Sequence, residues 1–388
     1  MPLEIQLNDP DLMRDPIAGY GRAREQAPVA ALVAPGFGPM WAVTRHAESR
    51  AMLADPRFAL GDDSFQRLDV PAHCRPYLRT MQHLEGDEHA RLRRLVTPEF
   101  SARRGAEFRP RVERIVETML DELARAADPD GTVDLLRHFA TPLPMEIICE
   151  LVGVPTDDRP QWRAYGKAIA AGHGAAFVAA IPAIIEGARG AVDHKRNAPG
   201  HDLLSRLQKT DDQLTEAELV TFVWHLVLAG QTPTSLIANA VPVLLDHPDQ
   251  LAAFRASQAP GTVDELIRWC GPQLLAIPRQ AREDVGLGGE LVKKGDPVTA
   301  LLAAANRDPR AFTDPERFDV HRASNNHLGF AHGPHFCLGA PLARIQTEVA
   351  LTALFRRYPG LVVAGEGPTR IPDPATWRLP ELRVQLSE

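Results

Sequence analysis

The residues most able to do chemistry lie in segment 329–344, GFAHGPHFCLGAPLAR, which has Cys337 near its centre. Gly333 and Pro334 predict a tight turn before the cysteine, and Gly339 permits close backbone approach after it. A helical pattern begins at about Leu338, and the positive end of a helix favours thiolate over thiol. An isolated cysteine is most often a small buried hydrophobe. This position between two glycines, at a loop-to-helix junction, instead favours a functional thiolate.

Three histidines accompany the cysteine and raise the alternative of a zinc site. His327, His332, His335 and Cys337 fall within one short stretch of chain. Their order, His-x4-His-x2-His-x-Cys, does not match the paired ligand spacing of zinc sites, and no second pair of ligands follows. The spacing therefore argues against zinc.

Two other segments carry charged side chains at helical spacing. Glu265 and Arg268 stand at i and i+3, and His89 and Arg93 stand at i and i+4. Taken alone, such pairs are usually solvated surface features that contribute less than about 1 kcal/mol. Their positions relative to Cys337 favour a more specific role.

Taken together, these segments resemble the cytochrome P450 superfamily in its bacterial form. The pattern Phe330-x-x-Gly333-x-His335-x-Cys337-x-Gly339 is similar to the haem-binding loop of that family. The resemblance implies that Cys337 is the metal ligand, the axial thiolate of the iron of haem b. Phe330 would shield the sulfur, and His335 would reach a haem propionate. A thiolate ligand pushes electron density toward the iron and assists O–O cleavage.

The same resemblance implies roles for the charged segments. Haem carboxylates that are buried need fixed cations, because an unpaired buried charge is costly. The implied propionate-binding side chains are His89, Arg93 and Arg279. The family's Glu–Arg–Arg core, which holds the haem-side scaffold together, would comprise Glu265, Arg268 and Arg317 of the segment DPERF.

The segment LAGQTPT, residues 228–234, departs from the family pattern. Most members read Ala-Gly-x-acid-alcohol here, and the acid and alcohol organise water and deliver protons to dioxygen. This chain keeps Ala229 and Gly230 but has Thr232 at the acid position and Pro233 at the alcohol position. Proline lacks the N–H that would bond the Ala229 carbonyl, which predicts a kink with that carbonyl free. Thr232 or Thr234, a substrate hydroxyl or an ordered water would then replace the missing side chains.

Three functions follow as hypotheses. The favoured one is a haem-thiolate monooxygenase of specialised metabolism that oxidises a hydrophobic or aromatic small molecule or small peptide. Its electrons would come from NAD(P)H through a ferredoxin reductase and a ferredoxin. The alternatives are oxidative aromatic cross-linking of a small peptide or diketopiperazine, and a non-enzymatic haem sensor or carrier. By resemblance, the substrate pocket would be lined by segments 61–82, 169–177, 226–233 and 274–277, and by Trp377.

Long helical patterns must position these residues. Apolar periodicity predicts helices over 103–127, 141–152, 158–171 and 175–196, and a very long central helix over 215–245 that begins with an acid-rich first turn. Strands are predicted at 29–34, 41–44 and 274–281, with a hairpin-like stretch from 285 to 302. We therefore expect a mainly α (α+β) fold with a small β-rich region, forming one domain over 1–388. The resemblance places the haem between the long central helix and the cysteine loop.

Composition and charge limit the class of protein and the cellular compartment to be expected. The chain of 388 residues is 44% hydrophobic, and its net charge of −7 argues against a nucleic-acid-binding surface. The four cysteines lie far apart, which argues against a disulfide framework. The first residues carry no signal-peptide pattern, and no segment approaches the apolar length of a membrane span. We expect a soluble cytoplasmic protein that acts as a monomer.

Overall fold

The computed structural model describes residues 2–60, 69–170, 175–209, 214–257 and 261–387. These residues form two compact units, each assembled from three separate stretches of chain. The first unit lies within Met1–Gly61, Asn239–Leu338 and Glu366–Pro380, and the second within Asp62–Ala238, Gly339–Gly365 and Glu381–Glu388. The organisation of residues 1–388 as a single domain stays a prediction.

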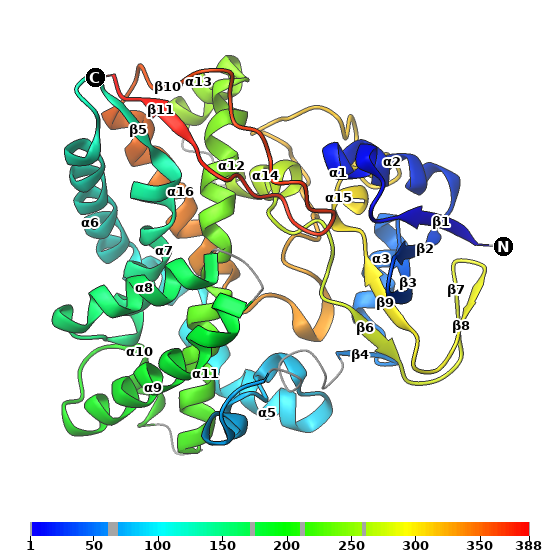
Figure 1. Ribbon diagram of the computed structural model, residues 1–388, viewed down its shortest axis with the longest axis horizontal. Coiled ribbons are helices and arrows are strands. Elements are labelled where there is room, and N and C mark those ends of the chain that lie inside the picture. Colours follow the sequence, from blue (N-terminus) through cyan, green and yellow to red (C-terminus); the bar gives the residue numbers. More distant parts are fainter. Residues whose placement is uncertain (1, 61–68, 171–174, 210–213, 258–260, 388) are drawn as a thin grey trace. The chain divides into compact units, whose positions relative to one another are not determined.

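The first unit is built on a six-stranded mixed sheet (Figure 1). Antiparallel pairing joins β2 to β3, with Ala31 opposite Trp41, and β3 runs parallel to β9, with Val43 opposite Ala300. Of the predicted strand 274–281, the last three residues form β6, so the prediction was too long at its start. In sheet order the strands are β1 (Leu3–Gln6), β2 (Val29–Ala34), β3 (Phe37–Val43), β9 (Pro297–Ala300), β6 (Arg279–Ala281) and β4 (Phe58–Leu60).

Short helices and one hairpin complete the first unit. The hairpin joins β7 (Val285–Leu287) to β8 (Glu290–Val292), and its turn residues Gly288 and Gly289 have φ of 58° and 92°. A two-residue turn of this kind needs positive φ at both central positions, which glycine adopts without strain. The helices are α1 (Pro10–Arg14), α2 (Pro16–Gln26), α3 (His46–Ala54), α13 (Pro248–Ser257), α14 (Thr262–Cys270) and α15 (Leu302–Ala305).

The second unit is helical. Its long helices α6 and α16 pack together (Figure 1), and Gly105 permits the close contact, because a Cβ there would lie 2.5 Å from Cδ1 of Ile345. A small sheet pairs β10 (Val362–Val363), β11 (Arg383–Gln385) and β5 (Thr132–Asp134) in that order. The helices are α5 (Gly86–Val96), α6 (Ala102–Ala126), α7 (Pro142–Val152), α8 (Arg159–Ala170), α9 (Ala175–Asn197), α10 (Leu203–Leu207), α11 (Glu216–Ala229) and α16 (Ala340–Arg357). The predicted fold class, mainly α with small sheets, is confirmed.

The prediction of one continuous central helix over 215–245 is wrong. Two helices occupy this stretch, α11 and α12 (Thr232–Leu245), with Gly230 and Gln231 between them. The predicted start is confirmed. Thr215 caps α11 through a reciprocal pair with Glu218, in which the Thr215 hydroxyl accepts from the Glu218 N–H and the Glu218 carboxylate accepts from the Thr215 N–H.

Among the described residues, α9 is the one helix whose length and apolar composition would suffice to cross a bilayer. Its apolar side chains Phe177, Ile181, Ile184 and Ile185 are buried, and the helix packs against α8 and α11. In its most apolar window, 39% of the helix is buried inside the structure.

Candidate functional site

The cysteine loop in the first unit is held by its own backbone. The Cys337 N–H donates to the Phe330 carbonyl at 2.9 Å, and the Phe336 N–H donates to the Gly333 carbonyl at 3.0 Å. The first of these bonds closes the loop, so it brings Phe330 next to the cysteine. The ring of Phe330 also stacks edge-on against Phe336, with their centroids 6.1 Å apart.

Gly333 is required by the geometry of this loop. Its φ is +77°, a conformation that side chains rarely adopt, and a Cβ there would lie 2.8 Å from the Leu53 carbonyl oxygen and 2.9 Å from Cα of Ala54. Both neighbours are backbone atoms of α3 and cannot move aside. The turn predicted from Gly333-Pro334 is therefore present, as a short 3-10 helix over Gly333–His335.

Cys337 differs from the other cysteines of the chain. Its side chain is exposed, whereas Cys74, Cys149 and Cys270 are buried, and none of the four is in a disulfide. Burial raises the pKa of Cys149 and of Cys270 to about 12, which keeps these thiols protonated and inert. An accessible sulfur is thus found at the one cysteine that sits in the glycine-rich loop.

The neighbouring histidines do not converge on Cys337. His327 Nε2 lies 2.9 Å from an Asp264 carboxylate oxygen, and His332 Nε2 accepts from Arg50 at 3.2 Å. The described residues contain no group of three or more His, Cys, Asp or Glu side chains that could hold a metal ion. His335 is partly buried at the end of the short 3-10 helix.

Arg279 is also in the first unit, on β6. Its side chain is buried, and Nη1 donates to the Phe58 carbonyl of β4 at 3.3 Å. A guanidinium can donate to a carboxylate through two N–H groups at once, which is the chemistry that the resemblance implies for Arg279.

The Glu265–Arg268 pair on α14 is a buried structural centre. Both side chains are fully buried, and Arg268 Nε and Nη2 donate to the two Glu265 carboxylate oxygens at 2.7 and 2.8 Å. Arg268 also donates to the carbonyls of Asn306, Pro315 and Arg317. Because both side chains are buried, the alternative of a solvated surface pair is excluded. The contacts of Arg268 with the three carbonyls tie α14 to the irregular segment that leads to the cysteine loop.

The third arginine of this centre was predicted incorrectly as Arg317. Arg322 takes that place, with its Nε donating to Glu265 at 3.0 Å and its side chain 9% exposed. The Arg317 side chain is exposed, and its backbone carbonyl is what joins the network, accepting from both Arg268 and Arg322. The segment turns at Asp314, three residues before Arg317, with a φ of +46°.

His89 and Arg93 lie on α5 in the second unit, as predicted. They are one helical turn apart, with His89 buried and Arg93 partly buried. The i, i+4 spacing places both on one face of the helix. Two nitrogen-bearing side chains at this spacing can bind the two oxygens of a carboxylate or two neighbouring carboxylates.

The break between α11 and α12 lies at Gly230 and Gln231, directly after Ala229. The missing N–H of Pro233 deprives the Ala229 carbonyl of its helical partner, so the kink that we predicted from Pro233 is present. Gly230 permits close packing at the break, because a Cβ at this position would lie 2.2 Å from Cδ1 of Ile148 on α7 and 2.6 Å from the Leu226 carbonyl oxygen. Pro233 is the second residue of α12, where the missing N–H costs little because the first helical N–H groups have no partner in the helix.

The carbonyl of Ala229 accepts a hydrogen bond from a side chain. The Thr232 hydroxyl donates to it at 3.1 Å, and the Thr232 side chain is exposed. Thr234 is buried, and its hydroxyl has no hydrogen-bond partner among the described residues. The side-chain amide of Gln231 is also buried and has no hydrogen-bond partner among the described residues. Gln231 was not among the residues predicted from the sequence. Of the two candidate threonines, Thr232 is therefore the accessible one.

The predicted substrate-pocket segments are only partly described. Residues 61–68 and 171–174 lie outside the described residues. Trp377 packs in the first unit against a buried cluster that contains Tyr20 and Leu274, and its carbonyl accepts from Asn239 Nδ2 at 3.1 Å.

Comparisons with known proteins agree on one family. The family model for cytochrome P450 matches residues 259–386. The cytochrome P450 monooxygenase PikC of Streptomyces venezuelae is 40% identical over 363 residues, which cover 91% of this chain and 86% of that protein. This chain belongs to the cytochrome P450 family. The 6-deoxyerythronolide B hydroxylase of Saccharopolyspora erythraea is 37% identical, over 92% of this chain and 91% of that protein.

Solved cytochrome P450 structures share the fold. The cytochrome P450 PksS of the bacillaene polyketide synthase from Bacillus subtilis 168 matches with a TM-score of 0.89 and 28% identity, covering 99% of this chain and 100% of that one. This P450 is accordingly a monooxygenase, an oxidoreductase that uses haem iron and electrons derived from NAD(P)H. It is of the bacterial type that serves specialised metabolism.

Proposed function

We propose that this P450 inserts one atom of dioxygen into a hydrophobic or aromatic small molecule or small peptide, with haem b ligated through Cys337. The observation that carries the proposal is the Cys337 loop. Its cysteine is exposed while the other three are buried, and its backbone turns at Gly333, where the φ of +77° and close backbone neighbours would strain any side chain. Two relatives, the monooxygenase PikC and the 6-deoxyerythronolide B hydroxylase, support oxygen insertion over oxidative cross-linking or a sensor function.

The residues present have the chemistry that a haem requires. Cys337 offers one accessible sulfur, and Phe330 is tied beside it by the 2.9 Å backbone bond, where its ring would shield the sulfur from water. The side chains that we propose to pair with the haem propionates are His89, Arg93, Arg279 and His335. Such pairing is needed because a carboxylate that loses water requires charge-assisted hydrogen bonds in exchange.

The haem, when bound, supplies the iron at which dioxygen is activated. Thr232 is the residue of this chain that we propose to hold the proton for this step. Its hydroxyl donates to the Ala229 carbonyl at 3.1 Å in the structure and can turn to donate to an oxygen atom or water nearby. Pro233 has no polar side-chain atom, and Thr234 is buried, so neither is as well placed.

We propose that a ferredoxin reductase and a ferredoxin deliver the electrons to a monomeric, cytoplasmic enzyme. Bacterial relatives of this type support the redox partners, and the buried packing of α9 supports a protein that does not span a membrane. Reconstitution with NADPH, ferredoxin reductase and ferredoxin should support turnover, whereas omission of the ferredoxin should abolish it. Equal turnover without ferredoxin would contradict this electron route.

Carbon monoxide binding tests the ligand assignment. The reduced wild-type protein with carbon monoxide should absorb at the long wavelength typical of thiolate-ligated haem. Cys337→Ser should lose that band, and Cys74→Ala, which changes a buried cysteine outside the loop, should keep it. A wild-type spectrum typical of a histidine-ligated haem would exclude Cys337 as the ligand.

Product mass tests the reaction type. With ¹⁸O-labelled dioxygen, oxygen insertion adds one labelled oxygen atom to the product, whereas ring coupling removes two hydrogens and adds none. A product that lacks the label and two hydrogens would replace oxygen insertion with oxidative cross-linking. A protein that binds haem and carbon monoxide but oxidises no substrate, while its ferredoxin still reduces it, would favour the sensor or carrier.

A further inference from the structure

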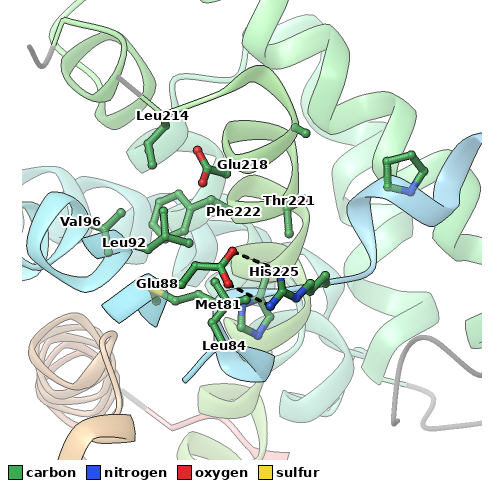
Figure 2. A pocket seen from close by; sticks show the side chains of 13 residues that line it. Met81, Leu84, Glu88, Leu92, Val96, Leu214, Glu218, Thr221, Phe222 and His225 are labelled. Atoms are coloured by element: carbon green, nitrogen blue, oxygen red, sulfur yellow. Dashed lines mark hydrogen bonds and ion pairs between the residues drawn. The ribbon is translucent and has the colours of Figure 1, made fainter. Parts of the chain in front are cut away.

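The second unit contains a cavity of about 160 Å³ to which the mechanism above assigns no role (Figure 2). Its walls come from α5, from α11 and from the loop segment 76–84 that precedes α5. A hydrogen bond of 2.6 Å from the indole N–H of Trp224 on α11 to the Tyr77 carbonyl fixes this segment against the helix. The cavity thus lies between elements that are tied together.

One face of α5 lines the cavity and an adjacent face carries the candidate haem contacts. Leu92 and Val96 line the cavity at i and i+4. His89 and Arg93 each stand one residue away from the series 88, 92, 96, which is a rotation of about 100° around the helix axis. The cavity therefore belongs to a different face of α5 from the proposed propionate site.

The charged groups around the cavity are already paired with one another. Arg79 and Glu88 form a salt bridge of 2.9 Å, drawn as dashed lines in Figure 2, and Glu218 pairs with Arg91. Most of the remaining wall is apolar, with Met81, Leu84, Leu92, Val96, Leu214 and Phe222 among its residues. Because these charged groups are paired with one another and the rest of the wall is mostly apolar, the wall offers a neutral occupant more contacts than a charged one.

His225 is the exception among the polar side chains of the wall. Its imidazole forms no hydrogen bond to another described residue, and Figure 2 shows it beside Met81 and Leu84. Burial, together with the charge of the nearby His83, lowers the pKa of His225 to about 4. The ring is therefore neutral at pH 7, with one nitrogen that donates and one that accepts.

We propose that this cavity binds a neutral, ring-sized part of the substrate that carries one hydroxyl or N–H group, with His225 as its hydrogen-bond partner. The volume of the cavity agrees with a ring-sized occupant, because an apolar cavity of about 150 Å³ admits a benzene ring. The position agrees as well, since His225 precedes Ala229 by four residues, about 6 Å along the same face of α11. Ala229 is the last residue of α11, and its carbonyl accepts from the Thr232 hydroxyl, so His225 lies one helical turn before the residue that Thr232 contacts. The assignment rests on the proposed oxidation, because it is the substrate of that reaction that occupies the cavity.

Binding of phenol and of toluene to the ferric holoenzyme tests this site. The two probes have nearly the same size, and only phenol can hydrogen-bond to His225. Calorimetry should show phenol binding about 3- to 10-fold more tightly than toluene, the range expected for one neutral hydrogen bond. His225→Phe should remove this preference and leave toluene binding nearly unchanged.

Substitutions that fill the cavity provide a second test of this binding site. Val96→Trp and Ala217→Phe each place a large side chain in the cavity and should weaken both probes at least 10-fold. Ala90→Trp, at an exposed position of α5 outside the cavity, is the matched control and should bind both probes normally. Equal binding of phenol and toluene to the wild type, or undiminished phenol binding in both filled variants, would overturn the assignment.

Competition shows whether the occupant is part of the substrate. Phenol should weaken the binding of any compound that shifts the Soret band of the wild type, and it should lose this effect in the filled variants. Phenol bound in the cavity without such competition would contradict the substrate assignment. The carbon monoxide band of each variant reports separately on the haem-thiolate centre, so failure of this site and failure of the proposed function give different results.

Discussion

Replacing Arg322 and Arg317 separately by alanine should give opposite results, because one side chain is buried in a charged network and the other is exposed. The Arg322 guanidinium donates to Glu265 at 3.0 Å and to the carbonyls of Thr313 and Arg317 at 2.7 Å each. The Arg317 network contact is made by its backbone carbonyl, which alanine retains.

The magnitudes follow from these contacts. A hydrogen bond to a charged group contributes about 1.5–3 kcal/mol, so Arg322→Ala should lower the free energy of unfolding by roughly 2–4 kcal/mol. At about 1.4 kcal/mol for each factor of ten, the unfolded fraction rises roughly 30- to 700-fold. Arg317→Ala should stay within about 0.5 kcal/mol of wild type, as exposed substitutions do.

Glu265→Ala should be the most damaging of this series. The Glu265 carboxylate accepts from Arg268, from Arg322, from the Asn325 amide and from the Asp319 N–H. Its removal leaves buried Arg268 without its counter-charge, at a cost of about 3–5 kcal/mol.

The assays for this series are urea unfolding and haem content per polypeptide. Haem content should fall in the order wild type and Arg317→Ala, then Arg322→Ala, then Glu265→Ala. Normal haem loading in Glu265→Ala, or equal destabilisation by Arg317→Ala and Arg322→Ala, would refute the assignment of Arg322 to the buried centre.

Three further outcomes are expected. Thr232→Val removes the exposed hydroxyl and should lower the amount of product formed per electron consumed several-fold and raise peroxide release. Thr234→Val should change this ratio less. The reverse order of effects would assign the proton role to Thr234. Gly333→Ala should destabilise the cysteine loop by more than about 1 kcal/mol, because φ is +77° and the new Cβ meets backbone of α3, and the carbon monoxide band measures the loss. The pKa of His225 is lowered from 6.5 to about 4, so the unfolded chain takes up its proton first as the pH falls. The stability that neutral His225 confers is therefore present above about pH 6.5 and is lost as the pH falls toward 4, by roughly 3 kcal/mol. Urea unfolding of His225→Phe should show a correspondingly smaller loss over that interval, and an unchanged loss would contradict a neutral, buried imidazole.

Local signals predicted much of the helical framework. The predicted helix 103–127 corresponds to α6, Ala102–Ala126, and 175–196 corresponds to α9, Ala175–Asn197. Both follow from apolar periodicity, and the start of α11 follows from the Thr215 capping box, because capping satisfies backbone N–H groups within the same turn. The cysteine loop was predictable for a similar reason, since its glycines and Cys337 are close in sequence.

Long-range packing decided the features that the sequence did not reveal. The sequence predicted one helix over 215–245 with a kink from Pro233, and the structure divides this stretch into α11 and α12. The close contact of Gly230 with Ile148 on α7 was not predictable, because these residues are far apart in the sequence. The cavity beside His225 likewise depends on α5 and the segment before it, which are remote in sequence from α11. No local pattern contains these contacts.

The sequence by itself determined the family, the position of the candidate thiolate and the buried Glu265–Arg268 pair, because each is carried by residue types at short, fixed spacings. Tertiary structure alone decided that Arg322 rather than Arg317 completes that pair. It also decided that Thr232 rather than Thr234 presents an accessible hydroxyl. In both cases two like residues lie close together in the chain, so local spacing does not tell them apart. Their burial depends on contacts with residues far away in the sequence, such as the contact of Arg322 with Glu265.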